Sequence, residues 1–367
     1  MSELATVNHF RKEKRKEKPP FFSFCIPEYN RFDFLSIALE SLKNQTFQDF
    51  EVCISDDCSP ERKHQEIVAY LESHDIAYCF ERQEKNLRYD GNLRATISMA
   101  QGRFCFLLGN DDKLLESDVL QKVHDFIAQQ NYYGVLLLNY FEISSGKNIR
   151  RVSNSSVIGT GVPVAMATFR DYSFVSGVLL PRAECHALVT TEFDGTEMYQ
   201  MYLGSRMVAE GTPLAGMDFL AIGKDIQIPG QKVDSYANRP GSKPGWPKAR
   251  YLPLGRMGWL VVRSIEKAVP ANRLDACIRS VFRQILGFTY GYWIVNYRKV
   301  QSWKYSLEIC MGMNPAYQLR GLNPGWFTRM YLWTLYLSIT MLGLLCPIFV
   351  FDSLEPTLYR IAKSRKR

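Results

Sequence analysis

Two adjacent carboxylates in the middle of the chain, Asp111 and Asp112, could hold a divalent cation. They follow an apolar run at residues 104–108, which predicts a short buried strand that ends in a polar turn at Gly109 and Asn110. A hard cation such as Mg²⁺ prefers oxygen ligands and usually takes one or two carboxylates together with phosphate oxygens. An isolated Asn-Asp-Asp turn is more often simply solvated, so the assignment depends on the segments that precede it.

Two earlier apolar runs end in the same way. Residues 21–26 and 50–55 each predict a buried strand, and polar or aromatic side chains follow both. The side chains at these two ends are Pro27, Tyr29, Arg31, Asp56 and Asp57.

The segments between these runs have the periodicity of helices that cover a sheet. Strand and helix patterns alternate through residue 130, which indicates an α/β fold with a mostly parallel, doubly wound sheet flanked by helices. In such sheets ligands bind outside the carboxyl ends of the strands, so the three ends are expected to converge on one site. The predicted helices cover residues 33–44, 61–73, 90–99 and 119–127, and a further strand covers 76–80.

The alternation fades in the second half of the chain. A strand at 134–143, an extended segment at 174–180 and a helix at 196–210 are followed by a stretch rich in Pro, Gly and basic residues. The predicted parts are a flexible basic leader (1–20), an α/β domain (21–228) with two halves (21–130 and 131–228), a linker or loop (229–255) and a helical C-terminal region (256–367).

The composition limits the classes of partner. With 46% hydrophobic and 22% charged residues the chain is neither disordered nor wholly embedded in a membrane. The net charge of +8 is concentrated near the ends, where anionic lipid is as good a partner as nucleic acid. No zinc-finger or recognition-helix pattern accompanies the basic ends, so we expect no nucleic acid. Nine singly placed cysteines and the lack of an apolar N-terminal segment favour the cytoplasmic side.

Residues 330–351 form a run of 22 residues without a charge, bounded by Arg329 and Asp352. That length can cross a bilayer, which needs roughly 20 residues. A crossing would place the basic tail outside, against the positive-inside tendency, and Pro347 interrupts the run. We therefore favour a helix or broken helix pair that lies in the membrane interface, with the basic tail on anionic headgroups. A spanning helix and a helix buried in a soluble core are the alternatives.

Four motifs in the order of the chain carry a resemblance to a known family. They are Cys-Ile-Pro-Glu-Tyr-Asn-Arg at 25–31, Ile-Ser-Asp-Asp-Cys-Ser at 54–59, Asn92 with Ala-Gln-Gly at 100–102, and Leu-Leu-Gly-Asn-Asp-Asp at 107–112. Together they resemble the family 2 glycosyltransferases with a GT-A fold, in the bacterial abequosyltransferase-like branch that builds O-antigen and other surface polysaccharides. The resemblance covers about residues 21–215.

The resemblance implies an inverting enzyme that uses a nucleotide-sugar donor and a divalent cation, Mn²⁺ or Mg²⁺. Residues 21–130 would bind donor and metal, and 131–228 the acceptor, a glycan or a lipid-linked oligosaccharide. The Gln-x-x-Arg-Trp motif of processive members is missing, so one sugar per encounter is expected. The implied location is the cytoplasmic face of the inner or plasma membrane, with the C-terminal region on an anionic membrane surface.

Carried over by position, Pro27, Tyr29 and Arg31 would line the nucleoside pocket. Asp56 or Asp57 would accept a hydrogen bond from the base or the ribose.

Asp90 and Asn92 would help to close the same pocket. Asp111 would touch the ribose or the sugar, and Asp112 would bind the metal between the diphosphate oxygens. Asn110 stands at the first position of the family's Asp-x-Asp, where it offers an oxygen but no charge.

The acceptor hydroxyl must lose its proton as it attacks, which requires a carboxylate base. The family has an acid for this role at the start of a helix about 80–100 residues after the metal motif, and Glu197 fits that position with Asp194 as the reserve. An acid at a helix start is also a common placement that the helix dipole favours.

The leading hypothesis is therefore a membrane-associated transferase. A non-catalytic nucleotide-sugar-binding or scaffold subunit of a polysaccharide assembly complex is the alternative. Nucleotidyl transfer would need a Gly-rich first loop, which the sequence lacks, and nucleic-acid binding rests on charge alone.

Overall fold

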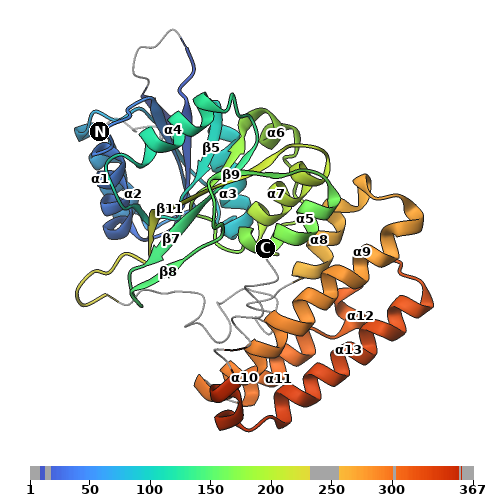
Figure 1. Ribbon diagram of the computed structural model, residues 1–367. Helices are drawn as coiled ribbons and strands as arrows, with labels where there is room; N and C mark the ends of the chain where they lie inside the picture. The colour runs from blue at the N-terminus through green and yellow to red at the C-terminus, as the bar shows by residue number, and fades with distance from the viewer. Residues whose placement is uncertain (1–8, 13–17, 232–255, 301–302, 355–356, 358–367) are drawn as a thin grey trace. The chain divides into compact units, whose positions relative to one another are not determined.

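The computed structural model describes residues 9–12, 18–231, 256–300, 303–354 and 357. The chain divides into two compact units, residues 1–164 with 168–233 and residues 165–167 with 234–367. We call them the sheet unit and the helical unit (Figure 1). Most of the predicted linker at 229–255 and most of the basic tail lie outside the described residues.

The sheet unit is built on an 11-stranded mixed sheet. Its strand order is β1-β4-β3-β2-β5-β10-β7-β11-β6, with β8 paired to β7 and β9 paired to β11. The strands are β1 (His9–Lys12), β2 (Phe22–Glu28), β3 (Phe50–Asp56), β4 (Tyr78–Arg82), β5 (Phe104–Leu107), β6 (Lys113–Leu114), β7 (Val135–Glu142), β8 (Lys147–Ile149), β9 (Ser156–Gly159), β10 (Val178–Pro181) and β11 (Leu214–Lys224).

The central strands run in one direction. β2 is parallel to β3 and β5, and β3 is parallel to β4. β10 is antiparallel to both β5 and β7, and β11 is parallel to β7, so β7 and β11 share the direction of β5. The predicted α/β fold with a mostly parallel centre is confirmed, and it brings the carboxyl ends of β2, β3, β5, β7 and β11 to one edge.

Two groups of helices cover the sheet. Apolar side chains of α1, α2 and α4 share one core with the central strands, through residues such as Leu39, Ile67, Val123 and Phe24. Helices α3, α6 and α7 form the second group. Each of them packs on strands of the sheet, α6 and α7 also pack against α3, and Figure 1 shows the sheet between the two groups. The helices are α1 (Phe32–Lys43), α2 (Glu61–Ser73), α3 (Arg88–Met99), α4 (Val119–Gln129), α5 (Val162–Thr168), the 3-10 turn η1 (Phe169–Tyr172), α6 (Arg182–Ala187) and α7 (Tyr199–Ala209).

Coverage on both faces explains why the strand sequences are apolar runs rather than alternating patterns. Every residue of β2 and of β3 is buried. The thiols of Cys25, Cys53 and Cys105 are free and buried, as expected for small hydrophobic side chains in a strand.

The predicted flexible leader is wrong for residues 9–12. They form β1, which pairs antiparallel with β4 and places Phe10 opposite Phe80. The Arg11 guanidinium donates to Glu51 Oε2 at 3.0 Å and to the Met99 carbonyl at 2.8 Å, so the edge strand is held by side chains as well.

The helical unit contains helices only, among the residues that the structure describes after 255. Helix α13 packs against α9 and α10, and α10 packs against α11. Gly343 allows close contact between α13 and α10, because a Cβ there would lie 2.9 Å from Ile294 Cδ1. The elements are α8 (Met257–Ile265), η4 (Glu266–Ala268), α9 (Ala271–Gln284), the π-helical η5 (Ile285–Tyr290), α10 (Gly291–Val300), α11 (Trp303–Gly312), α12 (Pro315–Gln318) and α13 (Trp326–Leu345).

The apolar run predicted at 330–351 lies in α13 and a short helix after it. The Arg298 guanidinium donates to the carbonyls of Gly343 and Cys346 and so closes the end of α13. The chain then bends by 109° into Ile348–Leu354. No single helix in the described part of the chain is long and apolar enough to cross a membrane, whereas this bent pair together has the length and composition. One face of α13 is exposed in this unit, so a helix buried on all sides is wrong.

Candidate functional site

Acidic side chains from separate strands meet at the carboxyl edge of the sheet. Glu28 ends β2, Asp57 follows β3, Asp111 and Asp112 follow β5, and Asp225 follows β11. Because these strands share one direction, their ends lie at the edge where α/β sheets bind ligands.

Asp112 is held in place on both of its oxygens. Its Oδ1 accepts a hydrogen bond from the Asp225 backbone N–H at 2.9 Å, and its Oδ2 accepts one from the Ser176 hydroxyl. The same hydroxyl accepts from the Gly109 N–H at 2.7 Å, which ties the turn to β10. Burial, followed by the charges of Asp111 and Asp225, raises the pKa of Asp112 well above its usual range. A cation beside this carboxyl would favour its charged form.

The residues around Asp112 fit a metal ion whose remaining ligands come from the substrate. Within the described ranges, no group of three or more His, Cys, Asp and Glu side chains could hold a metal ion alone. A divalent cation bound to a diphosphate takes only one or two carboxylates from the protein, with phosphate oxygens as its other ligands. Asp112, with Asp111 beside it, supplies that kind of donor set.

Lys224 and Asp225 were not predicted from the sequence. Lys224 Nζ lies 2.9 Å from Asp225 Oδ2 and 2.6 Å from Glu142 Oε1. Although burial opposes it, these two carboxylates raise the pKa of Lys224, which stays charged. The available signal was an apolar run that ends in a Gly-Lys-Asp turn, the same pattern as at the earlier strand ends.

Asn110 has a partner that explains its amide. Its Nδ2 donates to Glu28 Oε2 at 2.6 Å, and Glu28 Oε1 accepts from the Arg31 N–H at 2.6 Å. Glu28 is fully buried, and burial raises its pKa to about 7 despite these two donors. A carboxylate at position 110 would face that of Glu28, so the amide avoids a repulsion between like charges. The Arg31 guanidinium lies 2.5 Å from Asp111 Oδ2, which places Arg31 among the site residues.

Asp56 and Asp57 support the loops at the end of β3. Asp56 is fully buried, and its Oδ1 accepts from the Ser59 N–H at 3.0 Å, whereas the predicted contact with a base or ribose stays a prediction. Asp57 accepts from the N–H groups of Leu87 and Arg88 at 2.5 and 3.0 Å, which holds the start of α3. Burial raises the pKa of Asp57 to about 6.

Asp90 supports the loop that carries Glu197. Its Oδ2 accepts from the Glu197 N–H at 2.7 Å and its Oδ1 from the Tyr199 N–H at 3.1 Å, at the start of α7. Glu197 is buried and has a φ of 58°, a left-handed backbone that these hydrogen bonds stabilise. Burial raises the pKa of Asp90 to about 6. Asp90 therefore contacts the predicted base loop rather than an open pocket.

Tyr89 connects α3 to α7 through its hydroxyl. Burial raises the pKa of its hydroxyl well above the usual range, and the charges of Asp90, Glu197, Asp112 and Asp111 add to the effect. Within the described part of the chain, the hydrogen-bond contact of the Tyr89 hydroxyl is with α7. The Tyr89 hydroxyl itself donates to the side-chain carbonyl of a residue in α7, Gln200, at 3.0 Å.

Asp194, the reserve base, is not placed with these residues. Both of its oxygens accept hydrogen bonds from the Arg94 guanidinium, and its side chain is 38% exposed. This surface ion pair makes Glu197 the better candidate of the two.

The remaining predicted residues differ in accessibility. Tyr29 is 50% exposed and free to contact a ligand, whereas Pro27 is buried within β2. Asn92 is buried and donates to the Glu28 carbonyl at 3.0 Å, so it orders the end of β2.

Known proteins are similar in sequence to the part of the chain that carries this site. Residues 23–186 match the profile of Glycosyl transferase family 2. The chain is 36% identical over 99 residues to the abequosyltransferase RfbV of Salmonella typhimurium, which is 26% of this chain and 30% of that protein. It is 29% identical over 144 residues to a GalNAc(5)-diNAcBac-PP-undecaprenol beta-1,3-glucosyltransferase of Campylobacter jejuni, which is 37% of this chain and 46% of that protein. The matched stretches thus span less than half of either relative.

Solved structures share the fold. Residues 1–349 of S. aureus TarS, in complex with UDP-GlcNAc, superpose with a TM-score of 0.59 at 14% identity, covering 88% of this chain and 91% of that one. The same protein in complex with UDP gives a TM-score of 0.57. The sheet topology, the motif order and the profile match make residues 23–186 similar to the family 2 glycosyltransferases, and the sheet unit has the α/β arrangement of a GT-A fold.

Proposed function

We propose that this protein transfers one sugar from a nucleotide-sugar donor to a growing surface polysaccharide of the O-antigen type, with inversion at the anomeric carbon. The observation that carries the proposal is that Asp111 and Asp112 follow β5 at the carboxyl edge of the sheet, while α3 holds the Glu197 loop through Asp90 and α7 through Tyr89. The two sets of carboxylates come from different halves of the sheet unit, as donor activation and acceptor deprotonation require.

The donor is proposed to bind at the carboxyl edge of β2, β3 and β5. Tyr29 offers an exposed ring for the nucleoside, and Arg31 lies beside Asp111, where a ribose hydroxyl or a phosphate oxygen could replace part of their ion pair. Asp57 is a candidate acceptor for a base or ribose donor, since each carboxylate oxygen can accept a second hydrogen bond.

A divalent cation, Mn²⁺ or Mg²⁺, is proposed to bind Asp112. When bound, it would stabilise the negative charge that develops on the departing diphosphate. Ser176 and the Asp225 N–H orient Asp112 for that role, and Lys224 keeps the neighbouring carboxylates partly neutralised.

Glu197 is proposed to take the proton of the acceptor hydroxyl. It is buried, and its backbone N–H is held by Asp90, so the loop that carries it is fixed in place. Asp194 remains the reserve, but its ion pair with Arg94 would have to open first.

The acceptor is proposed to be a lipid-linked oligosaccharide at the cytoplasmic face of the membrane. One relative's name specifies a lipid-linked acceptor, and the exposed apolar face of α13 gives the chain a means of staying at a membrane surface. The predicted contribution of the basic tail concerns residues mostly outside the described structure.

The proposal is tested with the purified full chain and a panel of nucleotide-sugars. A donor that binds the native state should raise the melting temperature in the presence of Mn²⁺, and that donor should be hydrolysed slowly without acceptor. Asp112→Ala should abolish both effects, because it removes the proposed metal ligand. Glu197→Gln should keep the thermal shift and lose transfer to an acceptor, since only the base is changed.

Asp194→Asn is the matched control for Glu197→Gln and should retain transfer. Full activity in Asp112→Ala would reject the metal assignment. Donor binding without transfer under all conditions, unchanged by Glu197→Gln, would instead favour a non-catalytic binding subunit.

A further inference from the structure

One face of α13 is apolar and exposed along its whole length. The exposed side chains recur at helical spacing, and the helix carries no charge after Arg329. Exposed fractions run from 37% at Trp333 to 75% at Trp326. A continuous apolar face of this length marks a surface that binds a membrane or another protein. Its members are Trp326, Phe327, Met330, Trp333, Leu337, Met341, Leu342 and Leu345.

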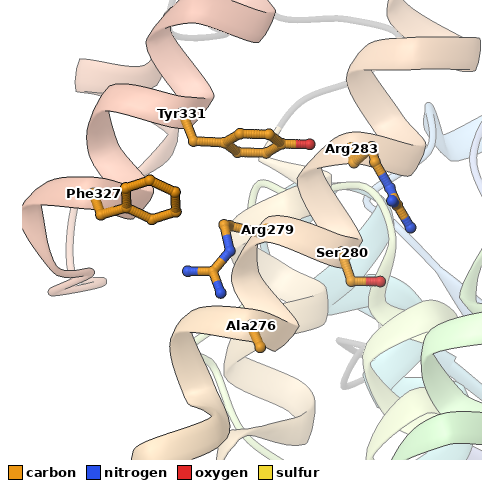
Figure 2. A pocket seen from close by; sticks show the side chains of 6 residues that line it. All are labelled: Ala276, Arg279, Ser280, Arg283, Phe327 and Tyr331. Atoms are coloured by element: carbon orange, nitrogen blue, oxygen red, sulfur yellow. The ribbon is translucent and has the colours of Figure 1, made fainter.

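A pocket of about 310 Å³ lies between this helix and α9. Figure 2 shows Phe327 and Tyr331 of α13 on one side, and Arg279, Ser280 and Arg283 of α9 on the other. The pocket therefore combines aromatic rings, a hydroxyl and two guanidinium groups, which is a donor set suited to a phosphate oxygen.

The two guanidinium groups are not neutralised by nearby acids. The Arg279 Nη1 donates to Thr328 Oγ1 at 2.6 Å and its guanidinium lies 5.6 Å from the Phe327 ring centre, while Arg283 is exposed. Between 256 and 354, leaving out 301–302, neither forms an ion pair with a carboxylate. The nearest acid on the same helices, Asp275, accepts from the Gly325 N–H and the Thr328 hydroxyl.

We propose that α9 and α13 form a docking surface for a bilayer with anionic lipids, in which a lipid headgroup phosphate occupies the pocket at Arg279 and Arg283. The apolar face of α13 would enter the boundary between headgroups and acyl chains, and the arginines would lie at the depth of the phosphates. The inference deepens the membrane association in the proposed function by naming the surface and the lipid group it binds.

The charge pattern favours an anionic bilayer over a second protein chain. Tryptophans at positions 326 and 333 and an adjacent pair of arginines are typical of helices that lie in a membrane interface. A protein partner would need carboxylates opposite the arginines, whereas every anionic lipid brings phosphate to that depth. The bend of 109° after α13 keeps the following helix from continuing along the same axis.

The test is flotation of the full-length protein with vesicles of phosphatidylcholine alone or with 30% phosphatidylglycerol. Binding should be stronger to the anionic vesicles. The double variant Arg279→Gln with Arg283→Gln should reduce that binding by about 25-fold, since one basic side chain near an anionic surface is worth about fivefold. Leu337→Gln should weaken binding to both vesicle types, because it removes apolar surface without charge.

Arg62→Gln is the matched control: its side chain on α2 is 89% exposed, and the variant should bind like the wild type. Circular dichroism of each variant confirms folding, and the test requires no catalysis, so an inactive enzyme would not affect its result. Added inorganic phosphate should not compete at millimolar concentration if the lipid headgroup is the ligand. Three results would overturn the proposal: no preference for anionic vesicles, unchanged binding in the double variant, or concentration-dependent self-association that Leu337→Gln abolishes.

Discussion

Asp90 offers the sharpest test of how the site is built. The family resemblance places it in the nucleoside pocket, whereas its two oxygens accept from the N–H groups of Glu197 and Tyr199. Asp90→Asn keeps the size of the side chain but leaves only one acceptor, so one buried N–H loses its partner. That loss costs about 1–3 kcal/mol. It should lower the melting temperature of the sheet unit by about 2–12 °C.

The same variant should lower kcat about tenfold to a hundredfold, since a displacement of the Glu197 loop by about 1 Å misplaces the base. The KM for the donor should change little if the role of Asp90 is to hold the loop, because its side chain is buried and both of its oxygens accept from that loop. Steady-state kinetics at varied donor concentration, together with thermal unfolding, measure both effects.

Asp194→Asn is the control, because it makes the same Asp-to-Asn change on an exposed side chain of the loop that Asp90 holds. Its ion pair with Arg94 is at the surface, so its loss should cost about 0–1 kcal/mol. A raised donor KM with unchanged kcat in Asp90→Asn would refute the loop role and restore the nucleoside-pocket prediction. An unchanged melting temperature would refute the energetic argument.

Further variants test other parts of the site and the core. Ser176→Ala should lower the apparent affinity for Mn²⁺ by about 10- to 100-fold, because it removes a hydrogen-bond donor that orients Asp112. The rate measured at increasing Mn²⁺ concentration gives that affinity. Glu28→Gln should flatten the pH dependence of stability: the folded pKa of about 7 exceeds the unfolded value of 4.5, so the wild-type contribution is greatest below pH 4.5 and falls by up to about 3 kcal/mol as the pH rises to 7. The free energy of unfolding is measured with urea at pH 5 and pH 8. An equal change between the two pH values in the wild type and the variant would contradict the prediction. Gly204→Ala should destabilise the protein by about 1–3 kcal/mol, since the new Cβ would lie 2.3 Å from the Tyr172 ring. If the variant melts at the same temperature as the wild type, the close contact between Gly204 and Tyr172 is contradicted.

The sequence was most informative where one local pattern determines one element. Apolar runs with polar ends predicted β2, β3 and β5 and their shared edge, because continuous burial leaves a continuous apolar run. The helix at 61–73 was predicted with its observed ends. β1 was missed, because its pairing with β4 joins segments about 70 residues apart and the basic residues around it are typical of a solvated leader.

The roles of individual acids were harder to predict, since each depends on a distant partner. Nothing near Asn110 in the chain indicates that its amide faces Glu28, and nothing near Asp90 indicates that it holds residues 197 and 199. Asp225 was not predicted as a site residue, because the strand before it lies beyond the region where strand and helix alternate. Local sequence thus locates acids at strand ends, while the tertiary fold decides which of them remain accessible.

The position of β11 has a consequence for synthesis of the protein. This strand is the last of the sheet in sequence, yet it lies between β7 and β6 and is the only described strand that pairs with β6. A nascent polypeptide that has emerged only as far as residue 213 therefore cannot complete the sheet, and Asp112 still lacks the Asp225 N–H. A ribosome-bound chain that exposes residues up to 213 should be sensitive to protease, and a longer one that exposes about a dozen more residues should be resistant and bind Mn²⁺.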